Sequence, residues 1–83
     1  MPETVIVTLR FGGKEADFEL PARTPLSALE EGLKRALRLA FPGTALPKGK
    51  LMLRSAGGYL KMEHTLEDYG IFDGSLLEVS DSL

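Results

Sequence analysis

The side chains of this 83-residue chain that could do chemistry are few. There is no cysteine and a single histidine, which excludes disulfides, thiol catalysis and zinc or iron–sulfur sites built from cysteine. His64 could act as a base, but the sequence implies no nucleophile beside it, so we expect an exposed loop histidine. Glu63, Glu67 and Asp68 could collect a cation, yet capping of a short helical turn explains them better. We therefore predict no catalytic residue and no metal site.

One connector superficially resembles a phosphate-binding loop. Gly43 and Gly49-Lys50 stand at its ends, but five residues separate the glycines instead of four. Leu51 also occupies the position where a Ser or Thr must hold magnesium. Because the connector follows a predicted helix rather than a strand, we expect an ordinary Gly/Pro connection and no cofactor.

The charge balance of the chain limits the classes of partner that it could bind. Ten Lys and Arg against twelve Asp and Glu give a net charge of −2, which argues against general nucleic-acid binding. We interpret Lys34, Arg35 and Arg38 as partners of Glu30 and Glu31 within one helix rather than as a site for an acidic partner. No apolar stretch approaches the roughly 20 residues of a membrane span, and the N-terminus lacks signal-peptide features. We expect a cytoplasmic protein without direct membrane insertion.

The first twenty residues predict a β-hairpin. Apolar and polar residues alternate over 4–10 and again over 16–20, with the Gly12-Gly13 turn signal between them. Pro21 ends the second strand. In this register Val5, Val7 and Leu9 face the core, and a slip of one residue would reverse the two faces.

An amphipathic helix follows, and its apolar positions are Leu26, Leu29, Leu33, Ala36, Leu37 and Ala40. Thr24-Pro25 or a capping box from Ser27 to Glu30 could begin it, and Phe41-Pro42-Gly43 ends it. Gly32 could allow a close approach to a sheet. Such a helix must bury its apolar stripe, so the sequence predicts an α+β domain in which one helix packs on a sheet.

The remaining elements are short. We expect a strand over 50–55, a brief edge strand over 59–62, a helical turn over 65–69 and a last strand over 76–80. Thr65 should cap the turn, with Asp68 three residues on. The element order is compatible with the first and last strands lying side by side as a parallel central pair.

Residues 46–79 resemble the corresponding stretch of ubiquitin without a gap. The motifs that carry the resemblance are Leu53-x-x-Ala56-Gly57-x-x-Leu60 and Thr65-Leu66-x-Asp68-Tyr69-x-Ile71, followed by Leu77-x-Val79. The resemblance implies a ubiquitin-like β-grasp roll of the form ββαββ on a mixed sheet. It also implies an apolar plug at Leu66, a Tyr69 hydroxyl that ties down the preceding loop, and an Ile71 side chain that enters the core.

Within that superfamily the chain most resembles the small bacterial YukD/EsaB-like proteins, which accompany type VII (WXG100) secretion. The features are the stand-alone length, the first strand V-I-V-T-L-R, the closing D-G-S-L-L-E-V, and the absence of a conjugation tail. Ubiquitin-like modifiers need a C-terminal Gly-Gly, whereas this sequence finishes Val79-Ser80-Asp81-Ser82-Leu83. The resemblance therefore implies no covalent conjugation unless a downstream extension exists.

The recognition surface of ubiquitin is not retained. Its apolar patch aligns with Arg54, Glu78 and Ser80, and two of its chain-forming lysines align with Gly58 and Asp73. A different patch is predicted on the outward face of the sheet. There Ile6, Met52 and Leu76 are apolar anchors beside Arg54 and Glu78, which is a composition typical of protein-binding surfaces. Scattered exposed apolar residues, which are common on any surface, are the alternative.

We thus expect residues 1–83 to form a single ubiquitin-like domain that acts as a non-enzymatic adaptor. Its partners would be proteins, among them components of a type VII secretion machinery, at the periphery of a membrane complex. One alternative is a small ubiquitin-like auxiliary subunit of a multicomponent monooxygenase. Another is a modifier or sulfur carrier with a Gly-Gly tail further downstream.

Overall fold

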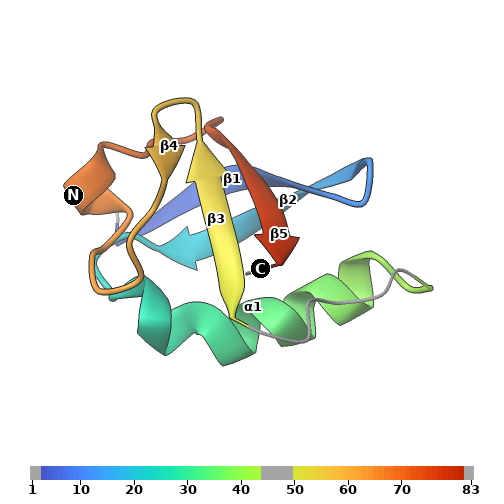
Figure 1. The fold of residues 1–83 in the computed structure, drawn as a ribbon. Helices are drawn as coiled ribbons and strands as arrows, with labels where there is room; N and C mark the ends of the chain where they lie inside the picture. The colour runs from blue at the N-terminus through green and yellow to red at the C-terminus, as the bar shows by residue number, and fades with distance from the viewer. Residues whose placement is uncertain (1–2, 44–49, 82–83) are drawn as a thin grey trace.

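A computed structural model describes residues 3–43 and 50–81, and in this part of the chain a curved sheet covers one side of a single helix (Figure 1). The strands are β1 (Thr4–Phe11), β2 (Lys14–Pro21), β3 (Leu51–Ser55), β4 (Gly58–Tyr59) and β5 (Leu76–Asp81). The helix α1 spans Leu26–Ala40, and a 3-10 turn, η1, spans Glu67–Tyr69. This is the predicted α+β arrangement. Residues 44–49 of the predicted connector, including Gly49, and the tail residues 82–83 lie outside the described residues.

The strand order β2-β1-β5-β3-β4 confirms the predicted central pair. β1 runs parallel to β5, with Thr8 opposite Leu76, whereas the β1–β2, β3–β5 and β3–β4 pairs are antiparallel. The hairpin between β1 and β2 turns at Gly12 (φ 59°) and Gly13 (φ 79°). Two successive positive φ angles define a type I′ turn, which suits the twist of the flanking strands and favours glycine.

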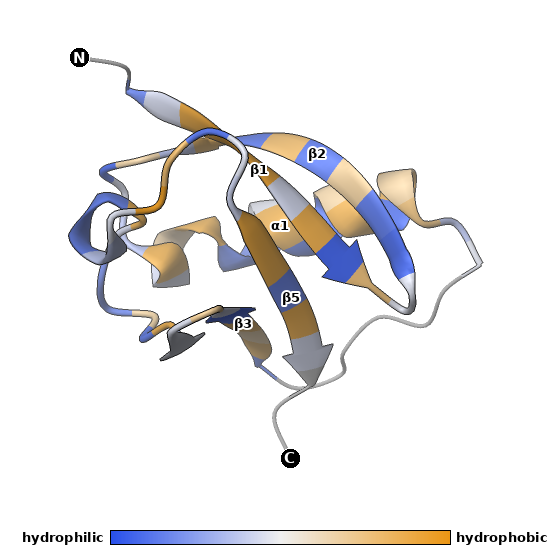
Figure 2. Ribbon diagram, turned by 90° about the horizontal axis from the view of Figure 1, so that it is seen from above, coloured by the Kyte–Doolittle hydropathy of each residue, from blue (hydrophilic) through white to orange (hydrophobic). Residues whose placement is uncertain are grey.

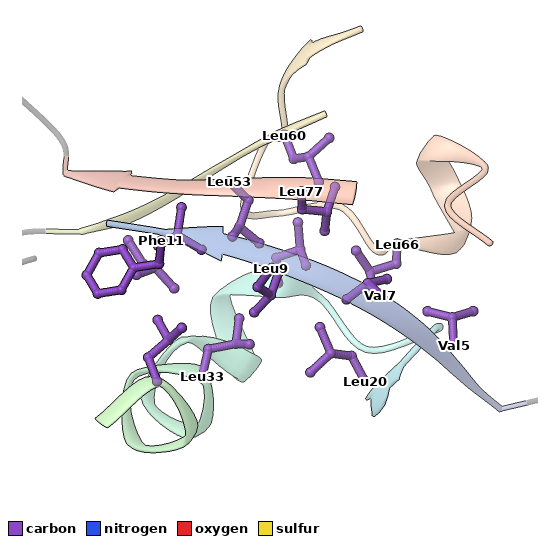
Figure 3. Close-up of a cluster of buried hydrophobic side chains, with 14 of the residues drawn as sticks. Val5, Val7, Leu9, Phe11, Leu20, Leu33, Leu53, Leu60, Leu66 and Leu77 are labelled. Carbon is purple, nitrogen blue, oxygen red and sulfur yellow. The ribbon is translucent and has the colours of Figure 1, made fainter. Parts of the chain in front are cut away.

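The core lies between the inner face of the sheet and α1 (Figure 3). Val7 and Leu9 are fully buried, as the predicted register requires, and they belong to the same buried cluster as Leu33 from the helix. Leu66 is also fully buried, which confirms the plug implied by the resemblance. Each fully buried side chain of this size contributes about 1.5–3 kcal/mol, so these contacts fix which face of the sheet points toward solvent.

The N-terminus of α1 differs from the prediction. The N-cap is Pro25, and neither Thr24 nor Ser27 makes a side-chain capping hydrogen bond. Instead the amide of Leu26 donates to the His64 carbonyl (2.9 Å), and the amide of Ser27 donates to the Met62 carbonyl (2.8 Å). Backbone oxygens of a distant loop thus satisfy two donors that a helix start leaves open. The side-chain capping prediction is wrong because tertiary contacts replaced it.

Two expectations about the sides of α1 are also corrected. Gly32 is exposed, and a Cβ built on it would meet nothing within 4 Å, so it does not bring the helix close to the sheet. Glu30 and Lys34 do form a long ion pair (4.0 Å), but their side chains are only 22% and 19% exposed. A Glu30 carboxylate oxygen also accepts a hydrogen bond from the Leu51 amide at 2.8 Å. This face of the helix is therefore partly joined to β3 rather than fully solvated.

The segment before β5 matches the local predictions. Thr65 and Asp68 form a reciprocal capping box: the Thr65 amide donates to the Asp68 carboxylate (2.9 Å), and the Asp68 amide donates to the Thr65 hydroxyl (3.1 Å). The Tyr69 hydroxyl accepts a hydrogen bond from the Lys61 amide at 2.7 Å. Ile71 is half-buried against the core.

The short edge strand is displaced from its predicted position. It spans Gly58–Tyr59 rather than 59–62, because Leu60 turns into the core and is 7% exposed. Within the described residues, no helix has both the length and the apolar character needed to cross a bilayer.

Candidate functional site

All five residues of the predicted patch lie on the outer face of the sheet, the face turned away from α1. Seen from that side, hydrophilic and hydrophobic residues alternate along β1, β2 and β5 (Figure 2). Ile6 is 48% exposed and Leu76 is 41% exposed. Met52 is half-buried opposite Ser80 on β5. The alternation of residues along the strands thus predicted the face of the sheet on which these side chains lie.

A row of charged side chains crosses this face. The strand registers align Glu15 with Arg10, Arg10 with Glu78, Glu78 with Arg54, and Arg54 with Tyr59. An Arg10 guanidinium nitrogen lies 2.7 Å from Glu15, and an Arg54 nitrogen lies 2.7 Å from Glu78. The row contains one residue from each strand, with alternating sign over its first four members. Opposite charges on neighbouring strands stabilise such a register.

The Arg54–Glu78 pair shifts the titration of both partners. The hydrogen bond from Arg54 and its positive charge lower the pKa of Glu78, with a smaller contribution from Arg10. The same hydrogen bond raises the pKa of Arg54. Both groups are solvent-exposed, so this pair fixes side-chain geometry more than it stabilises the fold. At two of the positions that align with the recognition patch of ubiquitin, this chain therefore holds a preformed ion pair.

A shallow groove adjoins the ion pair. It has a volume of about 770 Å³ and lies between the β3–β4 turn and the loop from η1 to β5. Its lining includes Arg54, Glu78 and Leu76, together with Tyr69 and Phe72. The structure thus brings three of the five predicted residues together at one groove. Ile6 and Met52 share the face but do not line the groove.

Phe72 is the residue that sequence reasoning missed. It is 69% exposed, more than any other aromatic side chain among the described residues. The Ser75 hydroxyl accepts a hydrogen bond from the Phe72 amide (3.1 Å), and the Phe72 carbonyl accepts one from the Ser75 amide (3.0 Å). The adjacent Asp73-Gly74 turn signal could have indicated a surface position, because connecting segments run over the protein surface.

Among the other chemically capable residues, His64, Asp68 and Tyr69 lie beside one another. His64 is exposed, its Nδ1 lies 3.6 Å from an Asp68 carboxylate oxygen, and its ring meets Tyr69 edge-on at 5.8 Å. Asp68 is committed to the capping box, and the amide of Thr65 lowers its pKa. Across residues 3–43 and 50–81, no three His, Asp or Glu side chains cluster as a metal site would require.

The fold assigns this chain to a class of proteins, and the comparison with family models then assigns it to a family. A mixed five-stranded sheet that covers one helix, with the first and last strands parallel at its centre, is the β-grasp fold of ubiquitin-like proteins. The family model described as "WXG100 protein secretion system (Wss), protein YukD" matches residues 4–79. The chain therefore belongs to the YukD family, a ubiquitin-like family of type VII secretion.

Solved structures agree with this assignment. The chain is similar to the ubiquitin-like domain of the Mycobacterium tuberculosis type VII secretion protein ECCD1, with a TM-score of 0.80 and 27% identity over 95% of this chain and 98% of that one. It also resembles part of the MycP5-free ESX-5 inner membrane complex, with a TM-score of 0.73 and 25% identity over 95% of this chain and 21% of that one.

A third likeness supports the fold alone. The EccD5 ubiquitin-like domain from Mycobacterium xenopi superposes with a TM-score of 0.70 at 21% identity, covering 99% of this chain and all of that one. No curated protein matches the sequence.

Proposed function

We propose that this protein is a non-enzymatic adaptor of a WXG100 secretion system, and that it binds a protein component of the machinery through the outer face of its sheet. The observation that carries the proposal is the YukD family match over residues 4–79. The likeness to the ECCD1 domain and to part of an inner membrane complex supports a position beside such a complex, reached through protein contacts.

The surface itself supports binding rather than catalysis. Ile6, Leu76 and Phe72 offer exposed apolar side chains on or beside the outer face, and the Arg54–Glu78 pair holds the groove rim in a defined geometry. Apolar anchors within a polar and charged rim are the usual composition of a protein interface. Conjugation through the C-terminus would be a different mechanism, and the intact mass of the protein recovered from its native cell distinguishes the two.

The test is affinity capture from the native cell with the tagged full chain and two variants. We expect the wild-type chain to retain a type VII membrane subunit, secretion ATPase or WXG100 protein. The double variant Ile6→Asp/Leu76→Asp should lose it, because both charges enter the apolar contact. Leu39→Asp is the matched control, since Leu39 is 81% exposed on α1, away from the sheet. Retention by the double variant, or equal loss with the control, would refute the outer-face assignment.

A further inference from the structure

The outer face carries more negative charge than its own cations compensate. β2 is an edge strand whose outward side chains are Glu15, Asp17 and Glu19, which we call the carboxylate column. Successive members lie two residues apart, which corresponds to about 6.6 Å along a strand. Glu15 is paired with Arg10. Asp17 and Glu19 form no ion pair within the described residues, and neither does Asp73 in the loop before β5.

The unpaired carboxylates are fixed in place by neutral hydrogen bonds. The Thr8 hydroxyl donates to Asp17 at 2.7 Å, and the Thr4 hydroxyl donates to Glu19 at 2.9 Å. An Asp73 carboxylate oxygen accepts a hydrogen bond from the Ile6 amide at 2.9 Å. These bonds orient the three carboxylates but place no positive charge beside them.

The same carboxylates flank the exposed apolar side chains. Ile6 is the cross-strand partner of Glu19 on one side and lies next to Asp73 on the other. Leu76 is aligned with Thr8, and Thr8 is aligned with Asp17 on β2. A partner that covers Ile6 and Leu76 therefore also lies against the carboxylates of Asp17, Glu19 and Asp73, which form no ion pair within the described residues.

From this juxtaposition we infer the chemistry of the partner: a segment in which apolar side chains alternate with Lys or Arg. The inference rests on the proposed function, because it specifies the ligand of that same face. A neutral apolar segment would desolvate the carboxylates without compensation, and an acidic segment would be repelled. Basic side chains compensate Asp17, Glu19 and Asp73 at the rim while the apolar side chains cover Ile6 and Leu76.

The experiment uses two synthetic peptides with the same pattern of leucines, one with lysine and one with glutamate at every polar position. Each is titrated into the isotopically labelled full chain and followed by NMR chemical shifts. We expect the lysine peptide to shift the amides of Ile6, Asp17 and Leu76 and to leave α1 unchanged. The glutamate peptide should leave the same amides unshifted. Added salt should weaken the lysine complex, because exposed charges are screened.

Isosteric variants then isolate the charge. Asp17→Asn/Glu19→Gln keeps an acceptor oxygen for each threonine hydroxyl, and we expect it to bind the lysine peptide about three- to tenfold more weakly, as for the loss of two exposed ion pairs. Glu31→Gln/Glu63→Gln changes the net charge equally at exposed positions away from the sheet face and should bind like the wild type.

Three results would overturn the inference: equal binding of both peptides, shifts that map to another surface, or equal weakening by the two double variants. The outcomes also separate this inference from the proposed function. If Ile6→Asp/Leu76→Asp abolishes capture of the secretion component while Asp17→Asn/Glu19→Gln leaves it intact, only the basic character of the partner is wrong.

Discussion

At the scale of single residues, Thr65 and Asp68 hold the entry to η1 through two reciprocal hydrogen bonds. Replacing a capping threonine with alanine removes an acceptor that the backbone amide needs. We expect Thr65→Ala to lower the free energy of unfolding by about 1 kcal/mol, measured by urea denaturation. Thr65→Ser keeps the hydroxyl and should stay close to the wild type. A loss as large in the serine variant would show that the methyl group, not the hydrogen bond, matters.

Asp68 also makes the stability of the chain depend on pH. The Thr65 amide lowers its pKa in the folded chain. Its contribution is therefore complete above the unfolded value of about 4 and is lost as the pH falls through the lower folded value. We expect Asp68→Asn to be less stable at neutral pH and to converge with the wild type in acid, when both are followed by urea denaturation from about pH 6 downward. Curves that stay parallel would contradict this role.

The spacing of Thr65 and Asp68 predicted the capping pair, and the resemblance to ubiquitin implied the Tyr69 hydroxyl bond. The capping pair and the Tyr69 hydroxyl bond join residues within eight positions of one another, and both were expected from the Thr65–Ile71 motif. The bond from the Ile6 amide to Asp73 spans 67 positions. No local pattern indicates such a contact, so the environment of Ile6 became evident only in three dimensions.

At the scale of elements, Glu30 joins α1 to the start of β3. Its carboxylate accepts the Leu51 amide at a partly buried position, and an amide left without an acceptor there is costly. We expect Glu30→Ala to lower the free energy of unfolding by about 1–3 kcal/mol, measured by chemical denaturation.

Glu31 provides the matched control for that change. It is the exposed neighbour of Glu30 on the same helix, and we expect Glu31→Ala to change stability by no more than about 0.5 kcal/mol. Similar effects of the two substitutions would mean that the Leu51 hydrogen bond contributes nothing beyond general helix charge.

Gly32 tests the outer side of the same helix. Because a Cβ there meets nothing within 4 Å, Gly32→Ala should raise the free energy of unfolding by about 0.5–1 kcal/mol through helix propensity and reduced freedom of the unfolded chain. Thermal unfolding of the purified chain measures this gain. A destabilised alanine variant would reveal a packing constraint that the structure lacks.

The helix shows why part of an element escapes prediction. Its apolar periodicity predicted a helix over these residues, since Leu26, Leu33 and Leu37 are its buried positions. Its capping partners could not be predicted, because they are the backbone carbonyls of Met62 and His64, and carbonyls carry no sequence signature. The role of Glu30 was missed because its partner is the backbone amide of Leu51, and a backbone amide likewise carries no sequence signature.

At the scale of the whole molecule, the strand pattern and the resemblance to ubiquitin predicted the fold, including the parallel pair of β1 and β5. They did not predict the charged row from Glu15 to Arg54. That row depends on the registers of strands that are far apart in sequence. The sequence therefore predicted the face of the sheet that carries the candidate site and five residues on that face. It did not predict the groove or the preformed ion pair beside it.

The central claim is that the outer face of this ubiquitin-like protein contacts a type VII secretion component. The most direct measurement places a photo-crosslinking amino acid at Leu76 or, as a control, at Leu39 in the full chain, with crosslinks identified by mass spectrometry from the native cell. The account predicts crosslinks to a secretion component from position 76 and none from position 39. Crosslinks to that component from position 39 alone would contradict it.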